Sequence, residues 1–165
     1  MSLGPGAFPQ PAGASDPRVP VIRRMRRGAG WFLTIAVLSG VNALLEIFDA
    51  KIRFIFGLGI TQAVDAIGHG GGQNGMIATM AVDGLFIVML ILCSRWAKAG
   101  SQGAFVGGMI AYALDGLLLL PFRMWLDAAV HGYALYLIWQ GYVAARELAQ
   151  MQQAAAPGLS QPTLP

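Results

Sequence analysis

The chain has 165 residues, of which 56% are hydrophobic and 12% are charged, and its formal net charge is +3. Soluble globular domains carry about a quarter of their residues as charges, so this composition excludes an ordinary soluble domain and indicates a protein of the lipid bilayer. Four basic residues lie directly before an apolar run, which favours contact with anionic lipid headgroups over a nucleic-acid-binding face. They are Arg23, Arg24, Arg26 and Arg27.

The two ends of the chain differ in composition from its middle. The first twenty residues are rich in Pro, Gly and Ala and have no helical periodicity. Together with the basic cluster they predict a disordered cytoplasmic tail over residues 1–29. A second disordered cytoplasmic tail is expected over residues 147–165, which leaves residues 30–146 as the transmembrane domain.

Four apolar runs in this domain are each near the 20 residues that a membrane-spanning helix needs. They predict spans at about 30–50, 76–95, 103–121 and 124–144. The positive-inside rule favours four spans with both termini in the cytoplasm, because a fifth span would move Arg95 and Lys98 to the outer side. The predicted fold is therefore an all-α membrane protein, an antiparallel bundle of four transmembrane helices.

The stretch IRFIFGLGITQAVDAI, residues 52–67, lies between the first two predicted spans. As a helix its 16 residues would cover roughly 24 Å, which is less than a hydrocarbon core of roughly 30 Å. It also contains Arg53, Gln62 and Asp65. An extra interfacial or re-entrant helix is expected here, and a fifth span is the alternative.

The same five-residue word, A-x-D-G-L, occurs in the second and the third predicted spans. Asp83 lies seven residues, roughly 10 Å, from the outer end of its span, and Asp115 lies six residues, roughly 9 Å, from the outer end of the next. The two aspartates are therefore expected at one depth in two antiparallel helices. The glycines that follow them, Gly84 and Gly116, are expected to let neighbouring helices approach.

The other two spans also carry polar groups toward their outer ends. Asn42 and Glu46 are four residues apart and share a helix face, and so do Asp127 and His131. Ionisable groups within a membrane usually face the interior of the bundle and find partners there. The sequence thus predicts one buried polar cluster, formed by Asn42, Glu46, Asp83, Asp115, Asp127 and His131.

Three interpretations of this cluster are open. It can be an interhelical hydrogen-bond network, a path for protons or ions, or a metal site. Bundle cores do build carboxylate–imidazole metal sites, and the candidate ligands here are Glu46, Asp83, Asp115 and His131. The Glu-x-x-His spacing of di-iron bundles is absent, and the sequence leaves the cofactor unknown.

A row of small residues, Gly103, Gly107 and Ala111, follows one face of the third predicted span. Such small-xxx-small rows allow two helices to pack closely. We expect this row to pack inside the bundle, and an interface between subunits is the alternative.

The words FGLGITQ-x-x-D at 56–65 and ALDGL at 113–117, together with His131 in the last span, resemble a group of small bacterial four-span membrane proteins of uncharacterised function. The resemblance covers roughly residues 29 to 147. It implies a bacterial four-span protein, which we expect in the cytoplasmic (inner) membrane, and it carries no activity and no catalytic residue.

Two classes of function follow from these observations. The first is a non-enzymatic membrane component, either an accessory subunit of a larger membrane complex or a self-assembling bundle. The alternative is a small protein that handles protons, ions or a metal through the polar cluster. An intramembrane enzyme is disfavoured because no recognisable nucleophile pattern accompanies His131.

Overall fold

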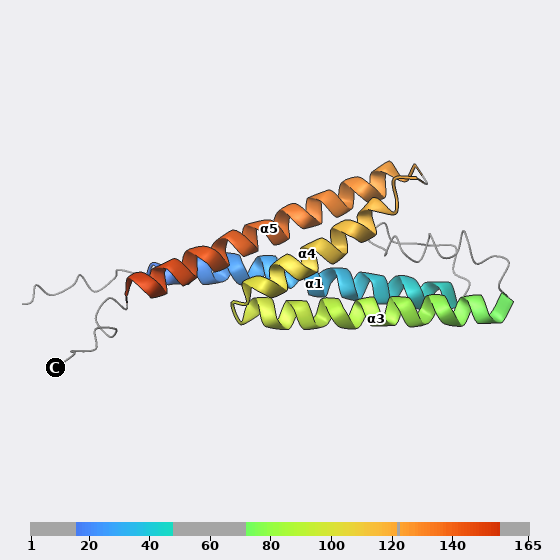
Figure 1. Cartoon of the computed structure of the whole chain (residues 1–165), viewed down its shortest axis with the longest axis horizontal. Coiled ribbons are helices and arrows are strands. Elements are labelled where there is room, and N and C mark those ends of the chain that lie inside the picture. The colour runs from blue at the N-terminus through green and yellow to red at the C-terminus, as the bar shows by residue number, and fades with distance from the viewer. Residues whose placement is uncertain (1–15, 48–71, 122, 156–165) are drawn as a thin grey trace, which may run out of the picture.

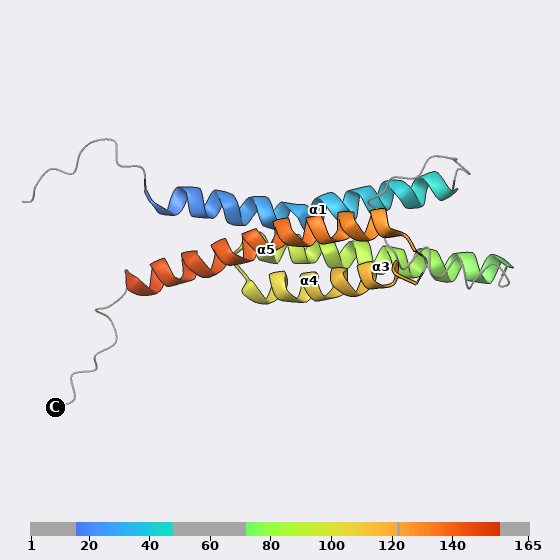
Figure 2. The same ribbon diagram turned by 90° about the horizontal axis from the view of Figure 1, so that it is seen from above.

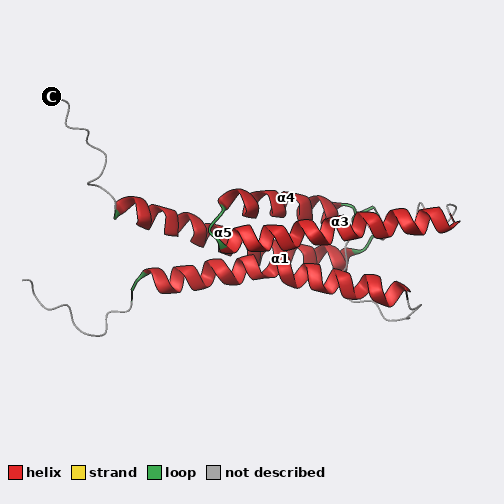
Figure 3. Ribbon diagram, turned by 90° about the horizontal axis from the view of Figure 1, so that it is seen from below, coloured by secondary structure: helices red, strands yellow, loops and turns green. Residues whose placement is uncertain are grey.

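The computed structural model describes residues 16–47, 72–121 and 123–155, and four helices occupy most of these ranges. They are α1 (Arg18–Ile47), α3 (Gly72–Lys98), α4 (Gln102–Leu117) and α5 (Trp125–Ala154). Consecutive helices run in opposite directions, so that α1 and α4 point the same way (Figures 1 and 2). The described part of the chain contains helices and turns but no strand, which confirms the predicted all-α class there (Figure 3).

Each helix packs against two neighbours. α1 lies against α3 and α5, and α4 lies against the same two helices on the other side. The bundle is staggered: the start of α1 and the end of α5 extend together past α3 and α4, while α1 and α3 extend past the α4–α5 turn at the opposite end (Figure 1).

The first helix begins about twelve residues earlier than the sequence predicted, and the last one continues to Ala154. The two predicted disordered tails are therefore wrong over residues 18–29 and 147–154. The physical reason is a packed stripe: Val21, Met25 and Ala29 are buried at a spacing of four, and Leu148 and Met151 of α5 pack against the same cluster. Residues 1–15 and 156–165 lie outside the described residues.

An exposed ion pair joins the same two helix ends. The guanidinium of Arg24 on α1 binds the carboxylate of Glu147 on α5. Because both side chains are more than a third exposed, this pair contributes little stability compared with the apolar stripe beside it.

Two of the described helices are long and apolar enough to cross a membrane, over Arg18–Leu45 and Met80–Lys98. Only 33% and 28% of the most apolar windows of these helices are buried, so most of their apolar surface faces outward. The helix predicted over 103–121 is shorter than expected and ends at Leu117. Pro121, which cannot donate to a helical hydrogen bond, and Arg123, at a left-handed φ of 57°, belong to the turn that follows.

The α3–α4 turn is set by two neighbouring residues. Gly100 has a φ of 93°, a conformation that side chains with a Cβ rarely adopt. Ser101 then caps α4, since its Oγ accepts a hydrogen bond from the backbone N–H of Ala104 at 3.3 Å. The interfacial or re-entrant helix predicted over 52–67 lies outside the described residues.

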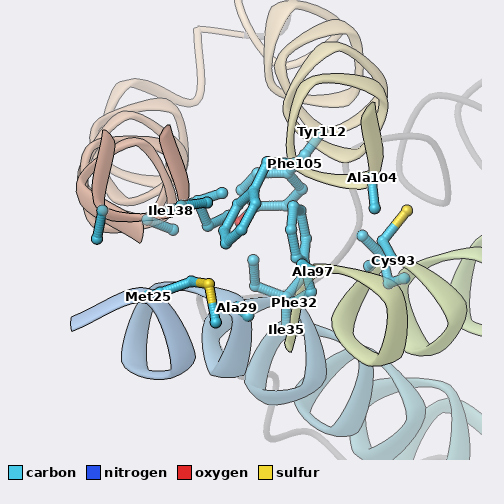
Figure 4. Close-up of a cluster of buried hydrophobic side chains, with 14 of the residues drawn as sticks. Met25, Ala29, Phe32, Ile35, Cys93, Ala97, Ala104, Phe105, Tyr112 and Ile138 are labelled. Carbon is cyan, nitrogen blue, oxygen red and sulfur yellow. The ribbon is translucent and has the colours of Figure 1, made fainter. Parts of the chain in front are cut away.

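The core lies where the four helices meet (Figure 4). Phe32 of α1 and Phe105 of α4 are fully buried, with their ring centroids 6.2 Å apart. Leu90 of α3 and Ile138 of α5 are also fully buried in this cluster. All four helices thus contribute to one continuous apolar core.

The predicted internal packing of the small-residue row is wrong for its two glycines. Gly103 and Gly107 are exposed, and no atom of the described helices and turns would lie within 4 Å of a Cβ at Gly107. The close contact lies one residue further on: a Cβ at Gly108 would lie 2.5 Å from Cε1 of Phe32 and 3.3 Å from Sγ of Cys93. The inward face of α4 is therefore one residue out of phase with the predicted row.

This difference in phase gives a direct test of the packing. Gly108→Ala is expected to destabilise the protein by about 1–3 kcal/mol, because the ring of Phe32 is fully buried and cannot swing away. Gly107→Ala, the matched control, is expected to leave stability unchanged or to raise it by up to about 1 kcal/mol. Thermal unfolding of the purified full-length chain, followed by circular dichroism, measures both. Equal melting temperatures for the two variants would contradict the described register of α4.

Candidate functional site

The main buried polar contact joins α4 to α5. Oδ2 of Asp115 lies 3.0 Å from Nε2 of His131, and the two side chains are 1% and 2% exposed. The two residues are 16 positions apart, on either side of the α4–α5 turn. Water is excluded from both side chains, so the contact between them offsets the free-energy cost of burying two ionisable groups.

The second ring nitrogen of His131 determines how many protons the pair holds. Nδ1 lies 2.9 Å from the backbone carbonyl oxygen of Asp127, one turn earlier in α5. A carbonyl oxygen only accepts, so Nδ1 carries a hydrogen and donates it. The Nε2···Oδ2 contact then holds one further proton, which is bonded either to Nε2 or to Oδ2. In both arrangements the pair is neutral overall, as an ion pair or as two uncharged groups.

The imidazole ring is also held on its faces. Tyr112, fully buried on α4, stacks on it with a centroid distance of 4.4 Å and an interplanar angle of 17°. A Cβ at Gly116 would lie 3.1 to 3.3 Å from atoms of His131. The glycine after Asp115 thus makes room for the histidine, as expected from the A-x-D-G-L word. Its counterpart Gly84 is exposed, and a Cβ there would meet no atom of the described residues within 4 Å, so no described helix makes the expected close approach at Gly84.

The remaining predicted site residues lie on α1, α3 and α5 and differ in how deeply they are buried. Asp83 is buried on α3, and Asn42 is half-buried on α1. Asp127 is half-buried and reaches His131 through its backbone carbonyl. Glu46 belongs to α1, but its side chain lies outside what the structure describes.

The two aspartates of the repeated word are offset along the bundle axis. Cys93 of α3 approaches Gly108 of α4, which gives a common level for the two antiparallel helices. Asp115 is seven residues from that level, about 10 Å, and Asp83 is ten residues from it, about 15 Å. Asp83 therefore lies about one helical turn beyond Asp115 instead of directly beside it.

The structure covers the predicted metal site only in part, because the side chain of Glu46, one of its four candidate ligands, lies outside the described residues. In the ranges that the structure covers, no three His, Cys, Asp or Glu side chains come together as ligands of an ion would. At Asp115 and His131, both ring nitrogens of the histidine are engaged. The pair can fix α4 against α5, and it can hold a proton between Nε2 and Oδ2.

Two buried hydroxyl groups also lie in the interior. Among the described residues, neither Oη of Tyr112 nor Oγ of Ser39 has a hydrogen-bond partner. Buried hydroxyls of this kind are commonly satisfied by ordered water. The sequence prediction did not include Tyr112, although its position three residues before Asp115 places it on the same helix face.

The candidate site is therefore the buried Asp115–His131 pair with Tyr112 and Gly116 packed around the ring. Its four members come from two helices joined by one short turn. No protein-family model, no curated protein and no solved structure matches the chain.

Proposed function

We propose that the chain is a non-enzymatic integral membrane protein, a four-span bundle that serves as an accessory subunit or as a self-assembling component of a bacterial cytoplasmic membrane. One observation carries the proposal. Large apolar side chains are exposed on every described helix, for example Val37, Leu85 (73% exposed), Leu114 and Leu126 (63% exposed), while Asp115 and His131 are sealed inside. A surface of exposed apolar side chains around buried ionisable groups favours contact with lipid or with another protein over contact with water.

The charges support the proposed topology. The start of α1, the end of α3 and the end of α5 lie at one end of the bundle (Figure 1). Basic residues gather there in all three helices, and the positive-inside rule assigns that end to the cytoplasm. They are Arg18, Arg23, Arg24, Arg26, Arg27, Arg95, Lys98 and Arg146.

The outward face of α4 supports the assembly part of the proposal. Gly103 and Gly107 are exposed beside Val106 and Ile110, so a helix of a neighbouring subunit could approach the backbone closely. The proposed partner is therefore a membrane helix, of a second copy or of a larger complex.

Reporter fusions combined with alkaline extraction test the proposal. The full-length chain is expected to stay in the membrane pellet after a carbonate wash. A fluorescent reporter that folds only in the cytoplasm is expected to be active when placed after Ala155 or within the turn at Gly100. The same reporter is expected to be inactive when it is placed at Pro121. Release by carbonate, or activity at all three positions, would contradict the four-span membrane protein.

A second candidate function, proton handling, is favoured by one specific feature. The contact between His131 and Asp115 holds a single proton that can move between Nε2 and Oδ2 without changing the net charge of the pair. The hydroxyls of Tyr112 and Ser39 supply further buried polar atoms that ordered water can connect.

A further inference from the structure

The basic cluster of α1 divides between two faces of the helix. Arg23, Arg24 and Arg27 follow the spacing of three and four that keeps side chains on one face, and Trp31 continues that face one turn later. These four residues line a cavity of about 250 Å³ whose opposite wall is Leu137 and Gln140 of α5. Arg26 lies elsewhere, in a separate cavity with Lys98.

The groove at Arg23, Arg24 and Arg27 has an excess of positive charge. Arg24 binds the carboxylate of Glu147. Within the described ranges, the guanidiniums of Arg23 and Arg27 have no acidic partner within ion-pair distance. Three cations against one carboxylate leave two positive charges at the mouth of the groove, which is suited to one anionic ligand with several acceptor oxygens, such as a phosphate group.

The walls of the same groove become apolar and aromatic along α1. Trp31 lies four residues beyond Arg27, a rise of about 6 Å. Its ring meets that of Tyr133 edge-on, with the centroids 6.2 Å apart, and Leu137 lies one turn from Tyr133 on α5. A charged mouth above an aromatic and aliphatic wall matches a phospholipid, whose phosphate is followed by an acyl chain, and Trp and Tyr are the residues of membrane interfaces. A free phosphate ion would use only the mouth.

We propose that the groove formed by Arg23, Arg27, Trp31, Leu137 and Gln140 binds one anionic phospholipid, with its phosphodiester on the guanidiniums and its acyl chain along Leu137. This inference rests on the proposed membrane location, and it assigns a defined lipid-binding site to the proposed membrane protein. The groove lies between α1 and α5, so a lipid bound there bridges these two helices.

The cavity at Arg26 provides a matched control. It is larger, about 370 Å³, and it also presents two cations, Arg26 and Lys98. Its remaining wall comes from small, aliphatic and amide side chains and contains no aromatic ring. A general attraction between cationic protein and anionic lipid would involve both cavities equally, whereas a specific site would involve only the groove beside Trp31.

The test measures lipid binding to the full-length protein in a mild nonionic detergent by native mass spectrometry. Phosphatidylglycerol and phosphatidylcholine with identical acyl chains are titrated separately. The wild-type protein is expected to retain one phosphatidylglycerol with at least about tenfold preference over phosphatidylcholine. Arg23→Gln/Arg27→Gln is expected to weaken that binding by about tenfold or more, since each cation near a lipid surface contributes substantially to binding. Arg26→Gln/Lys98→Gln, with the same change in charge, is expected to stay within about twofold of wild type.

Three results would overturn the proposal. Equal loss in the two double variants would mean a general electrostatic attraction. Equal binding of the two lipids would mean no recognition of the anionic headgroup. Displacement of phosphatidylglycerol by inorganic phosphate at equal concentration would mean a site for a free anion. Because binding is measured in detergent, its failure is distinguishable from a failure of the carbonate and reporter experiments that test the membrane location.

Discussion

Replacing Gly28 with alanine is expected to force α1 and α5 apart and to cost about 3 kcal/mol or more of stability. A Cβ at Gly28 would lie 2.4 Å from the Cα of Gly141 and 2.7 Å from its backbone nitrogen. Gly141→Ala is expected to have the same effect, because a Cβ at Gly141 would lie 2.7 Å from the Cα of Gly28. Backbone atoms cannot rotate away as the end of a side chain can, so the whole helices must separate. The separation would open the core beside Ala29 and Ile138, both of which are fully buried.

The same two helices offer matched controls for this substitution. Within the part of the chain that the structure describes, a Cβ at Gly30 of α1 or at Gly132 of α5 would meet no atom within 4 Å. Gly30→Ala and Gly132→Ala are therefore expected to keep or to raise stability, by up to about 1 kcal/mol, because alanine favours the helix. Thermal unfolding and the elution volume of the purified proteins measure the effect. A Gly28→Ala protein that melts together with Gly30→Ala would show that the two backbones do not approach in this way.

Breaking the Asp115–His131 pair from either side is expected to cost about 2–4 kcal/mol. Asp115→Ala removes the carboxyl that contacts Nε2 of His131, and His131→Ala removes the imidazole from the carboxyl and leaves a cavity beside Tyr112. The double variant is expected to lose less than the sum of the single losses, by about 1–2 kcal/mol, because the two residues act through one contact. Asp127→Ala, which keeps the backbone carbonyl that binds Nδ1, is expected to stay within about 0.5 kcal/mol of wild type. Strict additivity of the two single losses would contradict the contact.

The Asp115→Asn variant of the same series separates the two candidate functions. An asparagine amide can donate to Nε2 of a neutral His131, so the contact between α4 and α5 survives, but the proton between Nε2 and Oδ2 is gone. A structural pair therefore predicts normal assembly and normal stability within about 1 kcal/mol, with no change in the proton permeability of reconstituted vesicles. A proton-handling bundle predicts normal assembly together with loss of a dye-detected proton flux that the wild-type protein supports. Dissociation of the Asn variant would contradict both.

The sequence carries enough information to place Asp115 and His131 in one layer. Both lie close to the α4–α5 turn, and an ionisable group in an apolar helix must turn inward to find a partner. The spacing of three between Tyr112 and Asp115 carries the same information, and Tyr112 would have been predicted if aromatic residues had been considered with the charged ones. Asp83 is offset from Asp115 by about one helical turn, which residue counts from uncertain span ends do not resolve. The full cluster of six residues stays a prediction, because the side chain of Glu46 lies outside the described residues.

The phase of α4 could not be predicted from its sequence. The helix is apolar on all sides, so hydropathy does not separate the face of Gly107 from the face of Gly108. The face is decided by Phe32, whose ring fills the space that only Gly108 leaves open. The early start of α1 was missed for a related reason: the arginines that interrupt Val21, Met25 and Ala29 resemble a tail in composition, while the spacing of the three apolar residues is helical.

The closeness of Asp115 and His131 along the chain bears on how the protein is assembled. The two residues can meet as soon as α4 and α5 form a hairpin, before α1 is in place, because the contact closes a loop of only 16 residues. Under the proposed membrane location, the hairpin carries its carboxyl and imidazole into lipid as a neutral couple, whereas α4 alone would present an uncompensated carboxyl. We therefore expect α4 and α5 to insert together, and α1 to dock afterwards through the contact of Gly28 with Gly141, which spans more than one hundred residues of chain.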